Sequence, residues 1–241
     1  MRNDDPALWD LSELADAIAA NRISSVEATE ACLARIEVWQ PRVNAFLRLH
    51  KDKALAQAKA MDAELAAGQR RGPLHGVPMA HKDMYYRKGE LSTGGSAIRK
   101  DWRPSTTATV LDKLDRAGVV ELGFLNMAEF AAGPTGHNVH HGHCRNPWDQ
   151  TRVTGGSSSG SGASVAARMV YGALGSDTGG SIRLPASACG VVGMKATYGR
   201  VSRAGAVARS WTMDHVGPLT RRLLRASRQW HANYPVRGRI P

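Results

Sequence analysis

Hydrophobic residues recur every three or four positions in the first third of the chain, which predicts three amphipathic helices. The first helix has an apolar face made of Leu11, Leu14, Ala15 and Ile18. The second begins at a capping box formed by Ser24 and Glu27, and we expect Pro41 to end it. The third spans residues 51–67 and stops at Gly68. All three are expected to be scaffold rather than chemistry.

The pattern then changes to short apolar runs separated by a helix. Residues 76–83 form an apolar strand that delivers Lys82 at its C-terminal end, where α/β sheets commonly expose functional side chains. A helix predicted around residues 106–117 stops at Gly118 and leads into a strand predicted at 119–122. This alternation of strands and helices indicates an α/β architecture.

Glycine and serine dominate residues 133–205, yet this segment is not expected to be a linker. Apolar residues recur within it at helical spacing, whereas flexible Gly/Ser linkers show no periodicity. These residues are Val165, Ala166, Met169 and Val170. The segment therefore predicts tight turns around a packed helix.

The composition fits a folded protein with a sizeable core. The chain has 241 residues, of which 42% are hydrophobic and 22% charged, so disordered, collagen-like and disulfide-scaffold classes are excluded. No window approaches the roughly 18 apolar residues of a membrane helix, and the polar start is unlike a signal peptide, so we expect a cytoplasmic protein without membrane contact. Cys32, Cys144 and Cys189 are expected to be reduced thiols.

The positive charge is concentrated at the end of the chain. Residues 221–241 contain six arginines and no acidic residue, so they carry six of the eleven net positive charges. The remaining excess over residues 1–220 is ordinary, and we expect no nucleic-acid partner for this body.

Two glycine- and serine-rich turns, at residues 154–162 and 177–183, are the strongest candidates for chemistry. Consecutive glycines let backbone N–H groups converge on one point, which suits an anion or a developing oxyanion. A P-loop is disfavoured because Ser161 stands where that motif needs lysine. The nucleophile elbow of an α/β-hydrolase would make Ser158 the nucleophile, but residues 149–154 are too polar for the buried strand that it requires.

A serine nucleophile needs a base, and Lys82 is a candidate because desolvation at the end of an apolar strand lowers the pKa of an amine. The segments 76–83, 155–161, 175–186 and 189–195, taken together in order and spacing, resemble the amidase signature family. The resemblance covers about residues 8–220. It implies a mixed β-sheet flanked by α-helices, and hydrolysis of a small-molecule carboxamide without cofactor or metal.

The resemblance also implies a role for each residue of an unusual triad. Ser181 would be the nucleophile, Ser157 the bridging serine, and Lys82 the neutral base. The peptide bond before the bridging serine, between Gly156 and Ser157, would be cis. Backbone N–H groups from Thr178, Gly179 and Gly180 through to Ser181 would form the oxyanion hole. An acyl-enzyme on Ser181 would release ammonia or an amine.

Other polar groups are given structural roles. Asp177 and Arg183 are expected to form a structural charge pair, and Ser158, Ser159 and Ser161 to be caps and turn residues. The histidine-rich segment 137–144 contains no acidic residue and its spacing fits no zinc motif, so we expect a loop near the substrate entrance. Neighbouring Asp214 and His215 would point to opposite faces of a strand, so they are poor partners for a conventional triad.

Members of the family are about twice as long as this chain. We therefore expect residues 1–220 to be the N-terminal part of an amidase signature domain whose C-terminal half is missing. Residues 221–241 would then be an atypical basic tail, introduced by a change of reading frame near Thr220.

Three alternatives to a free-standing amidase remain open. The chain could be the glutamine-hydrolysing component of a tRNA-dependent amidotransferase, which needs partner subunits, whereas an amidase could form a homodimer. From other classes, it could be a protein that binds nucleic acid through its basic tail, or an inactive truncated product.

Overall fold

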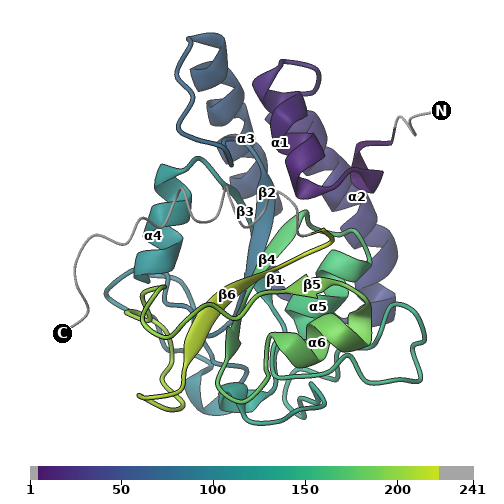
Figure 1. Ribbon diagram of the computed structural model, residues 1–241, viewed down its shortest axis with the longest axis vertical. Coiled ribbons are helices and arrows are strands. Elements are labelled where there is room, and N and C mark those ends of the chain that lie inside the picture. The colour runs from purple at the N-terminus through teal and green to yellow at the C-terminus, as the bar shows by residue number, and fades with distance from the viewer. Residues whose placement is uncertain (1–4, 223–241) are drawn as a thin grey trace.

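The computed structural model describes residues 5–222, and within them six strands form one mixed sheet flanked by helices (Figure 1). The strands are β1 (Phe46–Leu49), β2 (Pro78–Lys82), β3 (Val120–Leu125), β4 (Gly172–Asp177), β5 (Val192–Gly193) and β6 (His215–Thr220). They lie in the order β1-β3-β2-β4-β6-β5. β2 is parallel to both of its neighbours, and the remaining pairs are antiparallel. The expected α/β fold with a mixed sheet is confirmed.

The helices pack around this sheet. They are α1 (Leu11–Ala19), α2 (Ser25–Val43), α3 (Lys51–Ala66), α4 (Thr109–Arg116), α5 (Ser159–Ala166) and α6 (Arg183–Cys189), with short 3-10 turns at Pro6–Leu8, Ala97–Arg99 and Glu129–Ala131. Figure 1 shows α1 and α3 at the top, α4 on one side of the strands, α5 and α6 on the other, and α2 running from the top down the side of α5 and α6. The crossovers through α4 and α5 therefore cover opposite faces of the sheet.

The predicted end of the second helix is wrong. The Ser24–Glu27 capping box opens α2 as expected, but the helix continues through Pro41 to Val43. Proline removes only one backbone donor, and in the last turn this loss is tolerated. Asn44 ends the helix instead, with a left-handed backbone (φ 50°) and its N–H donating to the carbonyl of Gln40.

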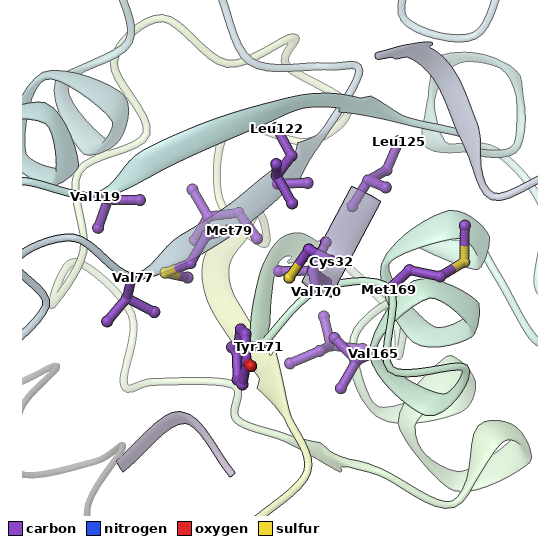
Figure 2. Close-up of a cluster of buried hydrophobic side chains, with 14 of the residues drawn as sticks. Cys32, Val77, Met79, Val119, Leu122, Leu125, Val165, Met169, Val170 and Tyr171 are labelled. Carbon is purple, nitrogen blue, oxygen red and sulfur yellow. The ribbon is translucent and has the colours of Figure 1, made fainter. Parts of the chain in front are cut away.

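The core lies between the sheet and its helices, and Figure 2 shows one part of it. Met79 and Leu122 from the strands, Cys32 from α2 and Val165 from α5 are all buried there. A packed helix, α5, is thus present in the Gly/Ser-rich segment as expected, but it ends at Ala166, so Met169 and Val170 of the predicted helical pattern lie beyond it. The three cysteines are free thiols and are buried. Within residues 5–222, no helix has the length and apolarity needed to cross a membrane.

The start of the basic tail packs against the body. The Arg221 guanidinium donates to the carbonyl of Val170 at 3.1 Å and to that of Trp9, and lies 5.3 Å from the centre of the Tyr171 ring. Residues 223–241 lie outside the described residues, and so does most of the predicted basic tail. The prediction of a changed reading frame concerns that segment and stays a prediction.

Candidate active site

Lys82 ends β2 and is completely buried among serine hydroxyls. Its Nζ lies 2.7 Å from the Oγ of Ser157, 3.0 Å from that of Ser158 and 2.9 Å from that of Ser176. Ser157 and Ser158 come directly before α5, and Ser176 lies on β4, the parallel neighbour of β2. Within residues 5–222, Lys82 forms no ion pair with a carboxylate.

Burial lowers the pKa of Lys82 well below its ordinary value, as expected from the sequence. More distant charges act in both directions: Asp177 and Asp214 raise this pKa, and Arg209 lowers it. Asp83, the neighbour in sequence, has its carboxylate turned toward Arg48 and Thr93. The lowered pKa favours the neutral form of the amine, the form that can accept a proton.

The segment before α5 adopts the backbone that the resemblance implies. The peptide bond between Gly156 and Ser157 is cis. A side chain at position 156 is excluded, because its Cβ would lie 2.4 Å from the backbone nitrogen of Gly136 and 2.5 Å from the carbonyl oxygen of Gly133. The backbone of this segment is thus tightly enclosed where it presents the Ser157 hydroxyl to Lys82.

Ser181 lies in the turn between β4 and α6 and is half-buried. The turn is held by the Asp177 carboxylate, which accepts the backbone N–H of Gly180 at 2.8 Å and that of Ile182 at 3.2 Å. Arg183 donates to the same carboxylate at 2.9 and 3.0 Å, so the expected Asp177–Arg183 charge pair is present. The structure brings Lys82 and Ser157 together, whereas the Ser181 hydroxyl forms no hydrogen bond within residues 5–222.

The predicted oxyanion-hole residues are all in this turn, but they are not equivalent. The N–H of Gly180 is already donated to Asp177. The hydroxyl of Thr178 donates to Asp214 at 2.5 Å, which ties the turn to the segment before β6. Gly179 is exposed.

A cavity of about 280 Å³ adjoins the lysine cluster. Its lining includes Ser176, Asp214 and His215, together with the apolar side chains of Val207 and Trp211. Ser176 thus borders this cavity and also contacts Lys82, which is itself not part of the lining.

Two residues of the lysine cluster were not identified from the sequence. Ser158 was predicted to be a cap or turn residue, but its hydroxyl contacts Lys82 and donates to the carbonyl of Ser176 at 3.2 Å. The sequence predicted no role for Ser176. The available signal was its place near the end of a strand, which becomes informative only once β4 is known to pair with β2.

The other polar candidates do not form a second catalytic group. His140 pairs with Glu129 at 2.9 Å, and the rings of His137 and His143 lie 4.5 Å apart. In the part of the chain that the structure describes, segment 137–144 forms no group of three metal-ligating side chains. Asp214 accepts from Thr178 and from backbone N–H groups rather than from His215.

A buried lysine with a lowered pKa, surrounded by serine hydroxyls at the end of a strand of a mixed sheet, is an arrangement of the serine–lysine type. The Amidase family profile matches residues 27–230. The chain therefore belongs to the amidase family.

The matches to similar proteins span most of this chain but less than half of the length of each relative. The glutamyl-tRNA(Gln) amidotransferase A subunit from Anaeromyxobacter dehalogenans (strain 2CP-C) is 52% identical over 211 residues, covering 88% of this chain and 43% of the relative. The protein of the same name from Moorella thermoacetica (strain ATCC 39073 / JCM 9320) is 53% identical over 209 residues, covering 87% and 43%. The structure of native peptide amidase from Stenotrophomonas maltophilia matches with a TM-score of 0.88 and 35% identity, covering 97% and 49%.

Proposed function

We propose that this chain carries the acyl-transfer site of an amidase, in which Ser181 attacks a carboxamide carbon. The observation that supports this most directly is the 2.7 Å contact between a buried lysine, without a carboxylate partner, and Ser157. Such an amine can take a proton, because desolvation disfavours its charged form.

Hydrogen-bond counting gives the path of the proton. A neutral amine has two N–H donors and one lone pair, yet Lys82 has three hydroxyl neighbours, so one hydroxyl must donate to it. The Ser158 hydroxyl is already donated to the carbonyl of Ser176. Ser157, at the shortest distance, is the donor that we assign.

We propose that protons move between the three side chains in the following order. As the Ser181 oxygen bonds to the carbonyl carbon, its proton moves to Ser157, and the Ser157 proton moves to Lys82. Collapse of the tetrahedral intermediate breaks the C–N bond, and the proton returns through Ser157 to the leaving amine. Water then hydrolyses the ester on Ser181. Catalytic hydrogen bonds often tighten only when substrate binds, as the contact from Ser181 to Ser157 must do here.

The oxyanion would be stabilised by backbone N–H groups of the turn that contains Ser181. We assign this role first to Thr178, Gly179 and Ser181. The N–H of Gly180 is held by Asp177, so it joins them only if that hydrogen bond is released.

The identity to the named relatives favours a second candidate, hydrolysis of glutamine as one component of an amidotransferase. The two bacterial relatives with that name are 52% and 53% identical to this chain, against 35% for the peptide amidase. In this case the chain would act with partner subunits, and ammonia rather than an amine would leave. Ammonia release from glutamine, compared with release from other small carboxamides, separates the two candidates.

The test of the site is covalent labelling of the full chain with a fluorophosphonate, followed by peptide mapping. We expect the label on Ser181, and its loss in Ser181→Ala. Ser187, exposed on the following helix, offers a matched control, and Ser187→Ala should label normally. Labelling that persists in Ser181→Ala would refute the nucleophile assignment, and an unlabelled wild-type chain would support the inactive-product alternative.

The remaining proposals concern the setting of the enzyme. Three free, buried thiols are compatible with a reducing compartment, and we propose a cytoplasmic location. Binding of nucleic acid through the basic tail would vanish when residues 221–241 are removed, whereas labelling of Ser181 reports on the body alone.

A further inference from the structure

A second group of ionisable side chains lies on the face of the sheet opposite Lys82. Glu121 projects from β3 and is 4% exposed, His50 directly precedes α3, and Glu90 lies in the segment after β2. Their backbone is fixed: the N–H of His50 donates to the carbonyl of Leu122 at 2.8 Å, and the N–H of Glu121 donates to the side chain of Gln57 at 3.1 Å. The three side chains are therefore held at one place.

Each carboxylate in this group has one oxygen with a close cationic partner and one buried oxygen without a hydrogen bond from the described residues. Oε2 of Glu121 contacts Arg87 and lies 3.1 Å from His81 Nε2, and Oε1 of Glu90 contacts Lys53. The other oxygens, Oε1 of Glu121 and Oε2 of Glu90, are buried and accept no hydrogen bond within residues 5–222. The same holds for Nδ1 of His50, which is likewise buried without a hydrogen-bond partner.

These three atoms without hydrogen bonds face one another. His50 Nδ1 lies 3.5 Å from Glu90 Oε2 and 3.8 Å from Glu121 Oε1, and all three lie within 4.8 Å of one another. Ligand atoms around a tetrahedral Zn²⁺ lie about 3.4 Å apart, since each is about 2.1 Å from the metal. Shifts of less than about an ångström would close the cluster to that geometry.

We propose that His50, Glu90 and Glu121 bind a divalent transition-metal ion of the Zn²⁺ type, with water completing its coordination. One imidazole nitrogen and two carboxylate oxygens suit such an ion. His81 and Arg87, on the far oxygen of Glu121, orient that carboxylate from behind.

The ammonium of Lys53 would compete with a metal ion for this site. Its ammonium contacts Glu90 and lies 3.5 Å from Oε1 of Glu121, so without metal it supplies the opposing charge. The side chain is 41% exposed, so it can turn into solvent when a metal ion enters. Removing its charge should therefore favour the metal, because a like charge within a few ångströms is lost.

The experiment is calorimetric titration of the full, chelator-treated chain with Zn²⁺, with Co²⁺ absorption as a second readout of inner-sphere ligands. We expect one equivalent to bind. His50→Ala and Glu90→Gln should each weaken binding by about tenfold or more, and Lys53→Met should tighten it by about tenfold. These positions are partly exposed, so the variants should fold, which circular dichroism checks.

The matched control is His140→Ala, which removes a histidine that also pairs with a glutamate but has no third ligand nearby. Its Zn²⁺ affinity should equal that of the unmodified chain. The proposal is overturned if no stoichiometric Zn²⁺ binds, if affinity survives both His50→Ala and Glu90→Gln, or if it falls with His140→Ala instead. If Lys53→Met does not increase the affinity for Zn²⁺, the inference that the metal ion displaces the Lys53 ammonium is overturned. None of these readouts depends on amidase activity.

Discussion

His81 and Lys82 are neighbours in β2 and are both buried, but their side chains lie in two electrostatically opposite environments. Lys82 faces α5 and contacts three hydroxyls, and it forms no ion pair with a carboxylate within residues 5–222. His81, on the other face, meets the carboxylate of Glu121, which also contacts Arg87. One face thus isolates a single base, whereas the other compensates a buried acid with several nitrogen donors.

The two environments shift pKa values in ways that favour opposite charge states. Burial lowers the pKa of Lys82, because the hydroxyls around it compensate desolvation only in part. Burial alone would raise the pKa of Glu121, but His81, Arg87 and Lys53 outweigh it and lower that pKa. The comparison shows that burial favours the neutral form of a base whose partners are hydroxyls, whereas cationic partners favour the charged form of an equally buried acid.

The largest expected effect is on chemistry at the lysine face. Lys82→Met should slow fluorophosphonate labelling of Ser181 by about 10²- to 10⁴-fold, because no base remains to take the proton. Methionine keeps most of the buried stem, so urea unfolding should show little loss of stability. Lys53→Met, on the opposite face, is the control and should label at the normal rate. An unchanged rate in Lys82→Met would contradict the assignment of the base.

The next effect is on stability at the opposite face. Glu121→Gln should lower the free energy of unfolding by about 3 kcal/mol, because the Arg87 guanidinium loses one of its two carboxylate partners. The measurement is urea unfolding with a chelator present. Asp112→Asn, in an exposed pair with Arg116, should change little. If Glu121→Gln were as stable as the parent chain, the stability of the fold would not depend on the ion pairs of Glu121 on this face.

Stability should rise with pH on account of both faces, but in different pH ranges and for different reasons. Between the lowered folded pKa of Lys82 and the ordinary value of 10.5, the unfolded chain binds one more proton, so stability rises with pH. The slope from this group is at most about 1.4 kcal/mol per pH unit and should disappear in Lys82→Met. The stability from Glu121 is present above the ordinary value of 4.5 and is lost as pH falls through its lowered pKa.

Unfolding curves for the parent chain, Lys82→Met and Glu121→Gln, measured across both pH ranges, provide the check. A Lys82→Met chain with the parent's alkaline slope would mean that Lys82 is protonated in the fold.

The smallest effect concerns the third hydroxyl on Lys82. Ser176→Ala should slow labelling of Ser181 by about tenfold, the equivalent of one hydrogen bond of about 1.4 kcal/mol that positions the amine. Ser187→Ala again serves as the control of equal chemistry on the surface. A rate equal to that of the parent would show that Ser157 and Ser158 suffice to hold Lys82.

The sequence by itself determined the parts of this protein that depend on short stretches of chain. Helical periodicity located α1 to α3, and the motifs around Ser157 and Ser181 indicated the family. The end of a short, mainly apolar strand predicted a lysine with a lowered pKa, since burial there follows from local hydrophobicity. The predicted end at Pro41 was wrong because a proline in the last turn removes only one donor.

Only the tertiary structure decided which side chains share a site. Ser158 and Ser176 are 76 and 94 positions from Lys82 in sequence, and parallel pairing of β2 with β4 brings Ser176 to it. The grouping of His50, Glu90 and Glu121 likewise depends on how α3, β3 and the segment after β2 meet. Strand pairing and helix packing act between residues far apart in the chain, so no local pattern in a single sequence records their outcome.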